Sequence, residues 1–81
     1  MQTNSLLDFE YRDNTNSMHV RVTEYVSSHN AEPTYRVSFH NTLLCVQHEV
    51  EKHYTKEIAY QYGYDLQRRY VQTLVDRLPR N

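Results

Sequence analysis

The stretch at residues 41–78 constrains the fold more than any other part of the chain, because its apolar and aromatic residues follow a helical spacing. One such residue recurs at every fourth position: Val46, Val50, Tyr54, Ile58, Tyr62, Leu66, Tyr70, Leu74 and Leu78. A half-buried strand would instead alternate apolar and polar residues. The spacing therefore predicts helix over almost the whole stretch.

A strict spacing of four residues cannot stay on one side of a straight helix. Each residue turns about 100°, so eight steps of four carry the stripe roughly 320° around the axis. Gly63, the only glycine in the chain, stands where a break is expected, because glycine readily adopts the left-handed conformation that ends helices. We therefore predict two helices, at residues 42–62 and 64–78, with a kink or joint at Gly63. One continuous helix that tolerates its glycine is the alternative.

The first half of the chain alternates apolar and polar residues, which is typical of strands with one buried face. Three such runs span about residues 5–12, 18–26 and 34–40, separated by turn-forming residues and by Pro33. Asn41 or Thr42 is suited to begin the first helix as its N-cap, and Pro79 to stop the second. The predicted fold is α+β: a three-stranded antiparallel meander covered by a long C-terminal helix, kinked or broken near Gly63 (β-β-β-α-α).

The predicted core joins the inner face of this sheet to the first helix. The sheet contributes Leu7, Phe9, Tyr11, Met18, Val20, Val22, Tyr35, Val37 and Phe39. The helix contributes Leu43, Val46, Val50, Tyr54 and Ile58. The second helix has an apolar arc that one small sheet cannot also cover: Leu66, Tyr70, Val71, Leu74, Val75 and Leu78.

Size and charge narrow the class of protein. Eighty-one residues form one small domain, and a net charge of −1 gives no general attraction to nucleic acid or anionic lipid. A single cysteine, Cys45, provides no internal disulfide and fits a reducing compartment. Because no leader and no long apolar run stands out, we expect a cytoplasmic location and no membrane association.

The first candidate surface is rich in tyrosine and arginine, two residue types favoured at protein interfaces. Its members are Tyr54, Tyr60, Tyr62, Tyr64, Arg68, Arg69 and Tyr70. We interpret them as a partner-binding surface. The alternative is that these tyrosines fill gaps between the helices and the sheet.

The second candidate surface is the outer face of the predicted sheet, where three adjacent strands each present an arginine. Its members are Arg12, His19, Arg21, Arg36 and His40. Such a face can contact phosphates or enter a major groove. Asp8 and Glu10 share this face and can neutralise two of the arginines, so a solvated, self-paired face is the alternative.

A third set lies on one stripe of the predicted first helix: Glu49, His53 and Glu57. Carboxylates and a histidine at that spacing can hold a metal ion or tune a proton-transfer group. A zinc site needs further convergent ligands, so we interpret the set as a solvated face and predict no metal site. His48 falls away from this stripe. No glycine loop, nucleophile elbow or paired-cysteine motif is present, and we expect neither a cofactor nor enzymatic activity.

The sequence therefore favours a small, non-catalytic interaction module, an adaptor or inhibitor of the kind that phages and mobile elements often encode. We expect it to bind a protein partner and to form a homodimer through its C-terminal helical region. A nucleic-acid-binding domain that uses the outer arginine face is the alternative.

Overall fold

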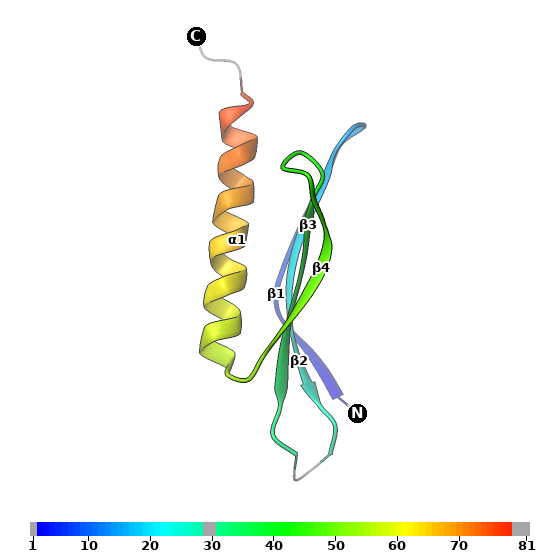
Figure 1. Cartoon of the computed structure of the whole chain (residues 1–81), viewed down its shortest axis with the longest axis vertical. Helices are drawn as coiled ribbons and strands as arrows, with labels where there is room; N and C mark the ends of the chain where they lie inside the picture. The colour runs from blue at the N-terminus through cyan, green and yellow to red at the C-terminus, as the bar shows by residue number, and fades with distance from the viewer. Residues whose placement is uncertain (1, 29–30, 79–81) are drawn as a thin grey trace.

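The computed structural model describes residues 2–28 and 31–78, which form a four-stranded antiparallel sheet with one helix against it (Figure 1). The elements are β1 (Gln2–Arg12), β2 (Ser17–Val26), β3 (Thr34–Asn41), β4 (Val46–His53) and α1 (Lys56–Asp76). The strand order is β1-β2-β3-β4, so each strand pairs with its neighbour in sequence. The α+β class and the antiparallel meander are confirmed. The prediction of three strands and two helices is wrong in detail, since the described chain has four strands and one helix.

The segment predicted as the first helix, residues 42–62, instead forms a turn, β4 and the start of α1. Asn41 ends β3, and its Oδ1 accepts the backbone N–H groups of Leu43 at 2.9 Å and Leu44 at 3.1 Å. These bonds use the same side-chain chemistry as a helix cap, but here they hold a tight turn into the next strand. The actual N-cap is Thr55, whose Oγ1 accepts the N–H of Ile58 at 3.3 Å.

Gly63 does not break the helix, and the predicted joint is wrong. α1 runs without interruption from Lys56 to Asp76. Gly63 lies within this helix, on the side that is buried against the sheet. A Cβ built on Gly63 would overlap Cγ2 of Val22 and lie 3.3 Å from Cδ2 of Leu7. The glycine therefore permits a close approach of helix to sheet, which is a packing role rather than a hinge role.

The core lies between α1 and the inner face of the sheet, as the strand alternation predicts. Its buried apolar members are Met18, Val20, Val22, Tyr35, Val37, Phe39, Ala59, Leu66 and Tyr70. Tyr54 and Ile58 were expected to cover the sheet but are 82% and 59% exposed, and Val50 is also exposed. The cover comes instead from residues spaced three or four apart within α1, the ordinary stripe of an amphipathic helix. No helix in the described ranges has the length and apolarity needed to cross a membrane.

A β-bulge in β4 decides which of its side chains face which way. Asn41 pairs with Val46, whereas Phe39 pairs with Glu49, so β4 has one more residue than β3 over this interval. Beyond the bulge, Glu49 and Glu51 share the helix side of the sheet with Phe39 and Val37. The extra residue thereby places His48 on the opposite, open face.

Candidate functional site

Five large apolar side chains remain exposed along one flank of α1 and just beyond its end. They are Tyr60, Tyr64, Val71, Val75 and Leu78, and between 39% and 62% of each is exposed. Steps of four, seven, four and three residues keep them on one side of a helix. We call this set the outer stripe. It is separate from the stripe of Ala59, Gly63, Leu66 and Tyr70 that is buried against the sheet.

The aromatic half of the outer stripe is ordered by its own contacts. The rings of Tyr60 and Tyr64 are stacked, with centroids 6.3 Å apart and planes inclined by 13°. The guanidinium carbon of Arg68 lies 6.0 Å from the centroid of the Tyr64 ring. That distance is at the edge of the range for a cation–π contact. These three side chains therefore form a continuous exposed surface about two helical turns long.

The other residues of the predicted partner-binding surface lie elsewhere. Tyr62 turns inward: its hydroxyl donates to Oε1 of Glu51 at 3.2 Å, and its ring packs 5.8 Å from that of Phe39. Tyr70 is 1% exposed and belongs to the core, so in this fold it is not available to a partner. Tyr54 is exposed at the corner between β4 and α1, and Arg69 is also exposed. Of the seven predicted residues, the structure groups Tyr60, Tyr64 and Arg68.

The open face of the sheet carries the residues of the predicted nucleic-acid surface. Arg21 is neutralised there, because its Nε donates to Oδ1 of Asp8 and its Nη2 to Oε2 of Glu10, each at 3.1 Å. The guanidinium carbon of Arg36 lies 4.8 Å from the ring centroid of Tyr25. Arg12 is exposed on the edge strand β1. The anticipated pairing with Asp8 and Glu10 is thus present, and both carboxylates bind the same arginine.

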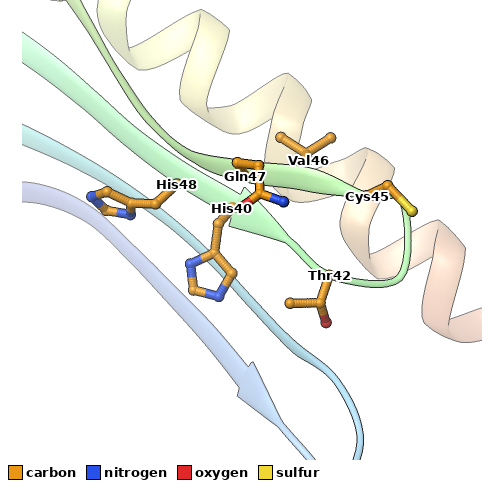
Figure 2. A pocket seen from close by; sticks show the side chains of 6 residues that line it. All are labelled: His40, Thr42, Cys45, Val46, Gln47 and His48. Atoms are coloured by element: carbon orange, nitrogen blue, oxygen red, sulfur yellow. The ribbon is translucent and has the colours of Figure 1, made fainter.

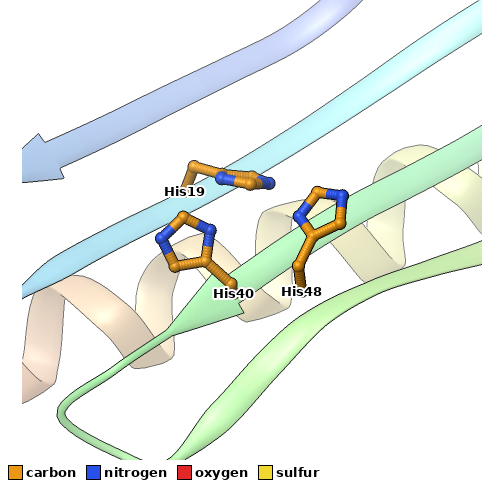
Figure 3. A group of neighbouring side chains, drawn as sticks. All are labelled: His19, His40 and His48. Carbon is orange, nitrogen blue, oxygen red and sulfur yellow. The ribbon is translucent and has the colours of Figure 1, made fainter.

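Three histidines from three neighbouring strands meet at the centre of this open face (Figure 3). His19 on β2 is directly opposite His40 on β3, and the bulge in β4 brings His48 alongside. The ring centroid of His19 lies 4.2 Å from that of His40 and 5.1 Å from that of His48. One ring nitrogen from each histidine lies within 4.8 Å of the other two. The sequence identified His19 and His40 on this face but not His48.

Burial and nearby positive charges lower the pKa values of His19 and His40. Burial lowers the pKa of His19 to about 4, helped by the positive charges that His40, Arg21 and His48 would place near it, while Glu10 opposes the shift. The pKa of His40 is also lowered, first by burial and then by His48, Arg12 and Arg21. At neutral pH both rings are therefore neutral, and each has one nitrogen with a free lone pair.

A shallow hollow lies beside the cluster, at the turn between β3 and β4 (Figure 2). Its lining residues are His40, Thr42, Cys45, Val46, Gln47 and His48. Cys45 has an exposed side chain and a φ of 62°, the left-handed conformation that the tight turn requires. The hollow gives solvent access to one side of His40 and His48.

The set Glu49, His53 and Glu57 does not form a single stripe. Glu49 and His53 lie on β4, on the side of the sheet that faces the helix, whereas Glu57 is in the first turn of α1. Nε2 of His53 lies 3.8 Å from Oε2 of Glu51, and its ring packs against Tyr62. The helical spacing that grouped the three residues is absent because the first two are in a strand.

Comparison with known proteins identifies no relative. No protein-family model matches the chain. The comparisons with characterised proteins and with solved structures likewise find no significant match.

Proposed function

We propose that this protein is a non-catalytic interaction module that self-associates through the outer stripe of α1. The supporting observation is the second apolar stripe of this helix, which stays exposed although the first is buried against the sheet. From Tyr60 to Leu78 it is about 27 Å long at 1.5 Å per residue. A row of exposed large apolar side chains on one side of a helix favours an interaction site over a solvated face.

A second copy of the chain fits the stripe because its two halves differ in shape. The N-terminal half carries the bulky rings of Tyr60 and Tyr64, and the C-terminal half carries Val71, Val75 and Leu78. In an antiparallel pair, the rings of one helix meet the smaller aliphatic side chains of the other, and large and small residues interdigitate. A parallel pair would place tyrosine against tyrosine and leave gaps between the valines. We therefore propose an antiparallel, two-fold symmetric helix pair.

The polar residues around the stripe are compatible with this pairing. Gln67 lies within it, and Arg68 and Gln72 border it. In the antiparallel arrangement the two-fold axis passes near residues 68–69, so the Arg68 side chains of the two copies lie near each other and extend to opposite sides of the pair, beside Gln67 and Gln72. Tyrosine and arginine, both present in or beside the stripe, are among the residue types that contribute most at interfaces.

The nucleic-acid alternative has weaker support from the described contacts. Of its three arginines, Arg21 is paired with two carboxylates and Arg36 is stacked on Tyr25. A phosphate would have to displace Asp8 and Glu10 to contact Arg21. Because non-specific binding depends on free cationic charge, we expect this face to bind nucleic acid poorly.

The experiment is the solution mass across a concentration series, measured by light scattering after size exclusion. We expect a dimer that dissociates on dilution. Val71→Asp places a charge in the centre of the stripe and is expected to shift the protein to monomer at concentrations where the wild type is dimeric.

Ile58→Asp is the matched control, because Ile58 is an exposed aliphatic residue on another side of the same helix. It introduces the same charge and is expected to leave the dimer intact. A wild type that stays monomeric at every concentration would overturn the proposal. Equal dissociation by both variants would also count against the outer stripe as the contact.

A further inference from the structure

The histidine cluster on the open sheet face has a geometry that neither self-association nor core packing requires. We propose that His19, His40 and His48 bind a divalent first-row transition-metal ion such as Zn²⁺ or Co²⁺, with three imidazoles as protein ligands. The three side chains come from three adjacent strands and converge on one point of the open face (Figure 3). This site lies on the opposite side of the sheet from α1 and its outer stripe.

The donor set matches the preferences of these ions. Three imidazoles with an open fourth position are an established arrangement for zinc bound together with water. Zinc–nitrogen bonds of about 2.0–2.1 Å require ligand nitrogens roughly 3.3 Å apart in a tetrahedral site. The candidate nitrogens lie within 4.8 Å of one another, so the rings must close by at most about 1.5 Å. The exposed side chain of His48 has room for that rotation.

Two of the three rings are already held in place. Nε2 of His19 lies 3.1 Å from Oγ of Ser38, and Nε2 of His40 lies 2.8 Å from Oγ of Ser17. Each serine hydroxyl can accept a ring N–H, in which case the nitrogen bonded to serine carries the proton and the other nitrogen has the lone pair that a metal ion needs. Partners of this kind orient metal-binding histidines and raise their basicity. The site therefore consists of two oriented imidazoles and one adjustable imidazole.

The surrounding charges tolerate a cation. Arg12 and Arg21 lie on the same face of the sheet as the cluster, opposite Ser17 and Ser38 in the strand register. Asp8 and Glu10 supply two negative charges on the same face, and both bind Arg21. These four side chains sum to no net charge. Arg36 and Lys52 share the face but lie four positions from His40 and His48 along β3 and β4, so the charge next to the proposed ion is balanced. Glu10 is the direct cross-strand neighbour of His19 and lies closest to the proposed ion position in the register.

The test is a titration of tag-free, chelator-treated protein with Co²⁺, followed by the visible absorption of the bound ion and then by displacement with Zn²⁺. We expect saturation at one ion per chain. His48→Gln should weaken binding by at least about tenfold, because even the loss of an outer partner costs 10–100-fold in metal affinity. His48 is exposed, so this variant should fold, and circular dichroism will check that it does.

His53→Gln is the matched control, because His53 is on the same strand but outside the cluster. It should bind Co²⁺ as the wild type does. In NMR spectra, Zn²⁺ should shift the ring signals of His19, His40 and His48 together and leave those of His53 unchanged. Absence of saturable binding, or equal affinity in wild type and His48→Gln, would overturn the proposal. The Val71→Asp variant should bind one ion per chain as well, which separates this site from the dimer.

Discussion

Gly63 of α1 lies so close to Val22 of β2 that a β-carbon on the glycine would overlap Cγ2 of the valine. Ala59, one turn earlier, is also completely buried. Two small residues one turn apart let the helix backbone approach the sheet closely. The spacing between the two layers is therefore set by residues that contribute almost no side chain.

Gly63→Ala is expected to destabilise the protein, although alanine favours helix by about 1 kcal/mol over glycine. Overpacking a filled site costs about 1–3 kcal/mol, so after the gain in helix propensity the expected net loss is up to about 2 kcal/mol in the free energy of unfolding. Urea unfolding followed by circular dichroism measures it. Arg69→Ala, at an exposed position of α1, should change stability by less than about 0.5 kcal/mol. A more stable Gly63→Ala variant would show that the layers can separate at little cost.

Tyr70→Phe is expected to stabilise the protein. The Tyr70 hydroxyl is buried and has no hydrogen-bond partner among the residues that the structure describes. A buried unsatisfied polar group costs about 1–3 kcal/mol, so removing it should raise the free energy of unfolding by about 1 kcal/mol. Tyr62→Phe is the comparison, because it removes a hydroxyl that does donate to Glu51, and it should lower stability slightly. If Tyr70→Phe and Tyr62→Phe change the free energy of unfolding in urea in the same direction, the Tyr70 hydroxyl is not an unsatisfied group that costs stability.

Asp13 makes the stability of the protein depend on pH in the acidic range. Its Oδ1 accepts the backbone N–H groups of Thr15 and Asn16, and Tyr11 donates to its Oδ2. These bonds, led by the one from Thr15, lower the pKa of Asp13 far below its ordinary value of 3.8. The folded state therefore holds this proton less tightly than the unfolded state does. The stabilisation is complete above about pH 4 and is lost as the pH falls towards the folded-state pKa.

Asp13→Asn should accordingly be less stable than the wild type at neutral pH, and the difference should shrink as the pH falls below about 4. Unfolding midpoints measured from pH 7 down to pH 2 check this. Asp65→Asn, at an exposed site on α1, is the control. If the difference in stability between Asp13→Asn and the wild type stays constant over this pH range, the Asp13 carboxylate is not the source of the pH dependence.

Cys45 occupies the left-handed backbone region at the turn between β3 and β4. This conformation costs an ordinary residue about 1–2 kcal/mol, but asparagine tolerates it and β-branched residues tolerate it least. Cys45→Asn should therefore be at least as stable as the wild type. Cys45→Val should be less stable than Cys45→Asn by at least about 1 kcal/mol in urea unfolding. Equal stability of the two variants would mean that the turn can adopt another conformation.

The sheet and its core could be predicted from the sequence because alternation specifies both a strand and its buried face. Met18, Val20 and Val22 are buried as that pattern requires. β4 could not be found in this way. Most of its outer positions and most of its inner positions are polar, because it is an edge strand that the helix covers only in part. Val46 and Val50 happen to continue the four-residue spacing of α1, so the spacing predicted helix over residues that form β4.

The sequence does contain a signal for the true start of α1, but it extends over only a few residues. Thr55 followed by Lys56 and Glu57 is a reasonable helix start, and it competed with Asn41 and Thr42. The histidine cluster was missed for the same reason: with residues 46–53 predicted as helix, His48 could not lie beside His40 on a sheet. Even with β4 assigned, the alternation alone would place His48 with the inward set. The bulge that turns it outward has no clear signature in the sequence.

The order of the elements along the chain has a consequence during synthesis on the ribosome. All four strands precede α1, and each pairs with the strand made just before it. The sheet can therefore begin to form while the helix that covers its apolar face is still being translated. The 21 residues of α1 take about 1–4 s to synthesise at 5–20 residues per second. Until α1 docks on the sheet, Val20, Val22 and Val37 have no cover, and we expect aggregation of nascent chains to depend on how soon α1 docks.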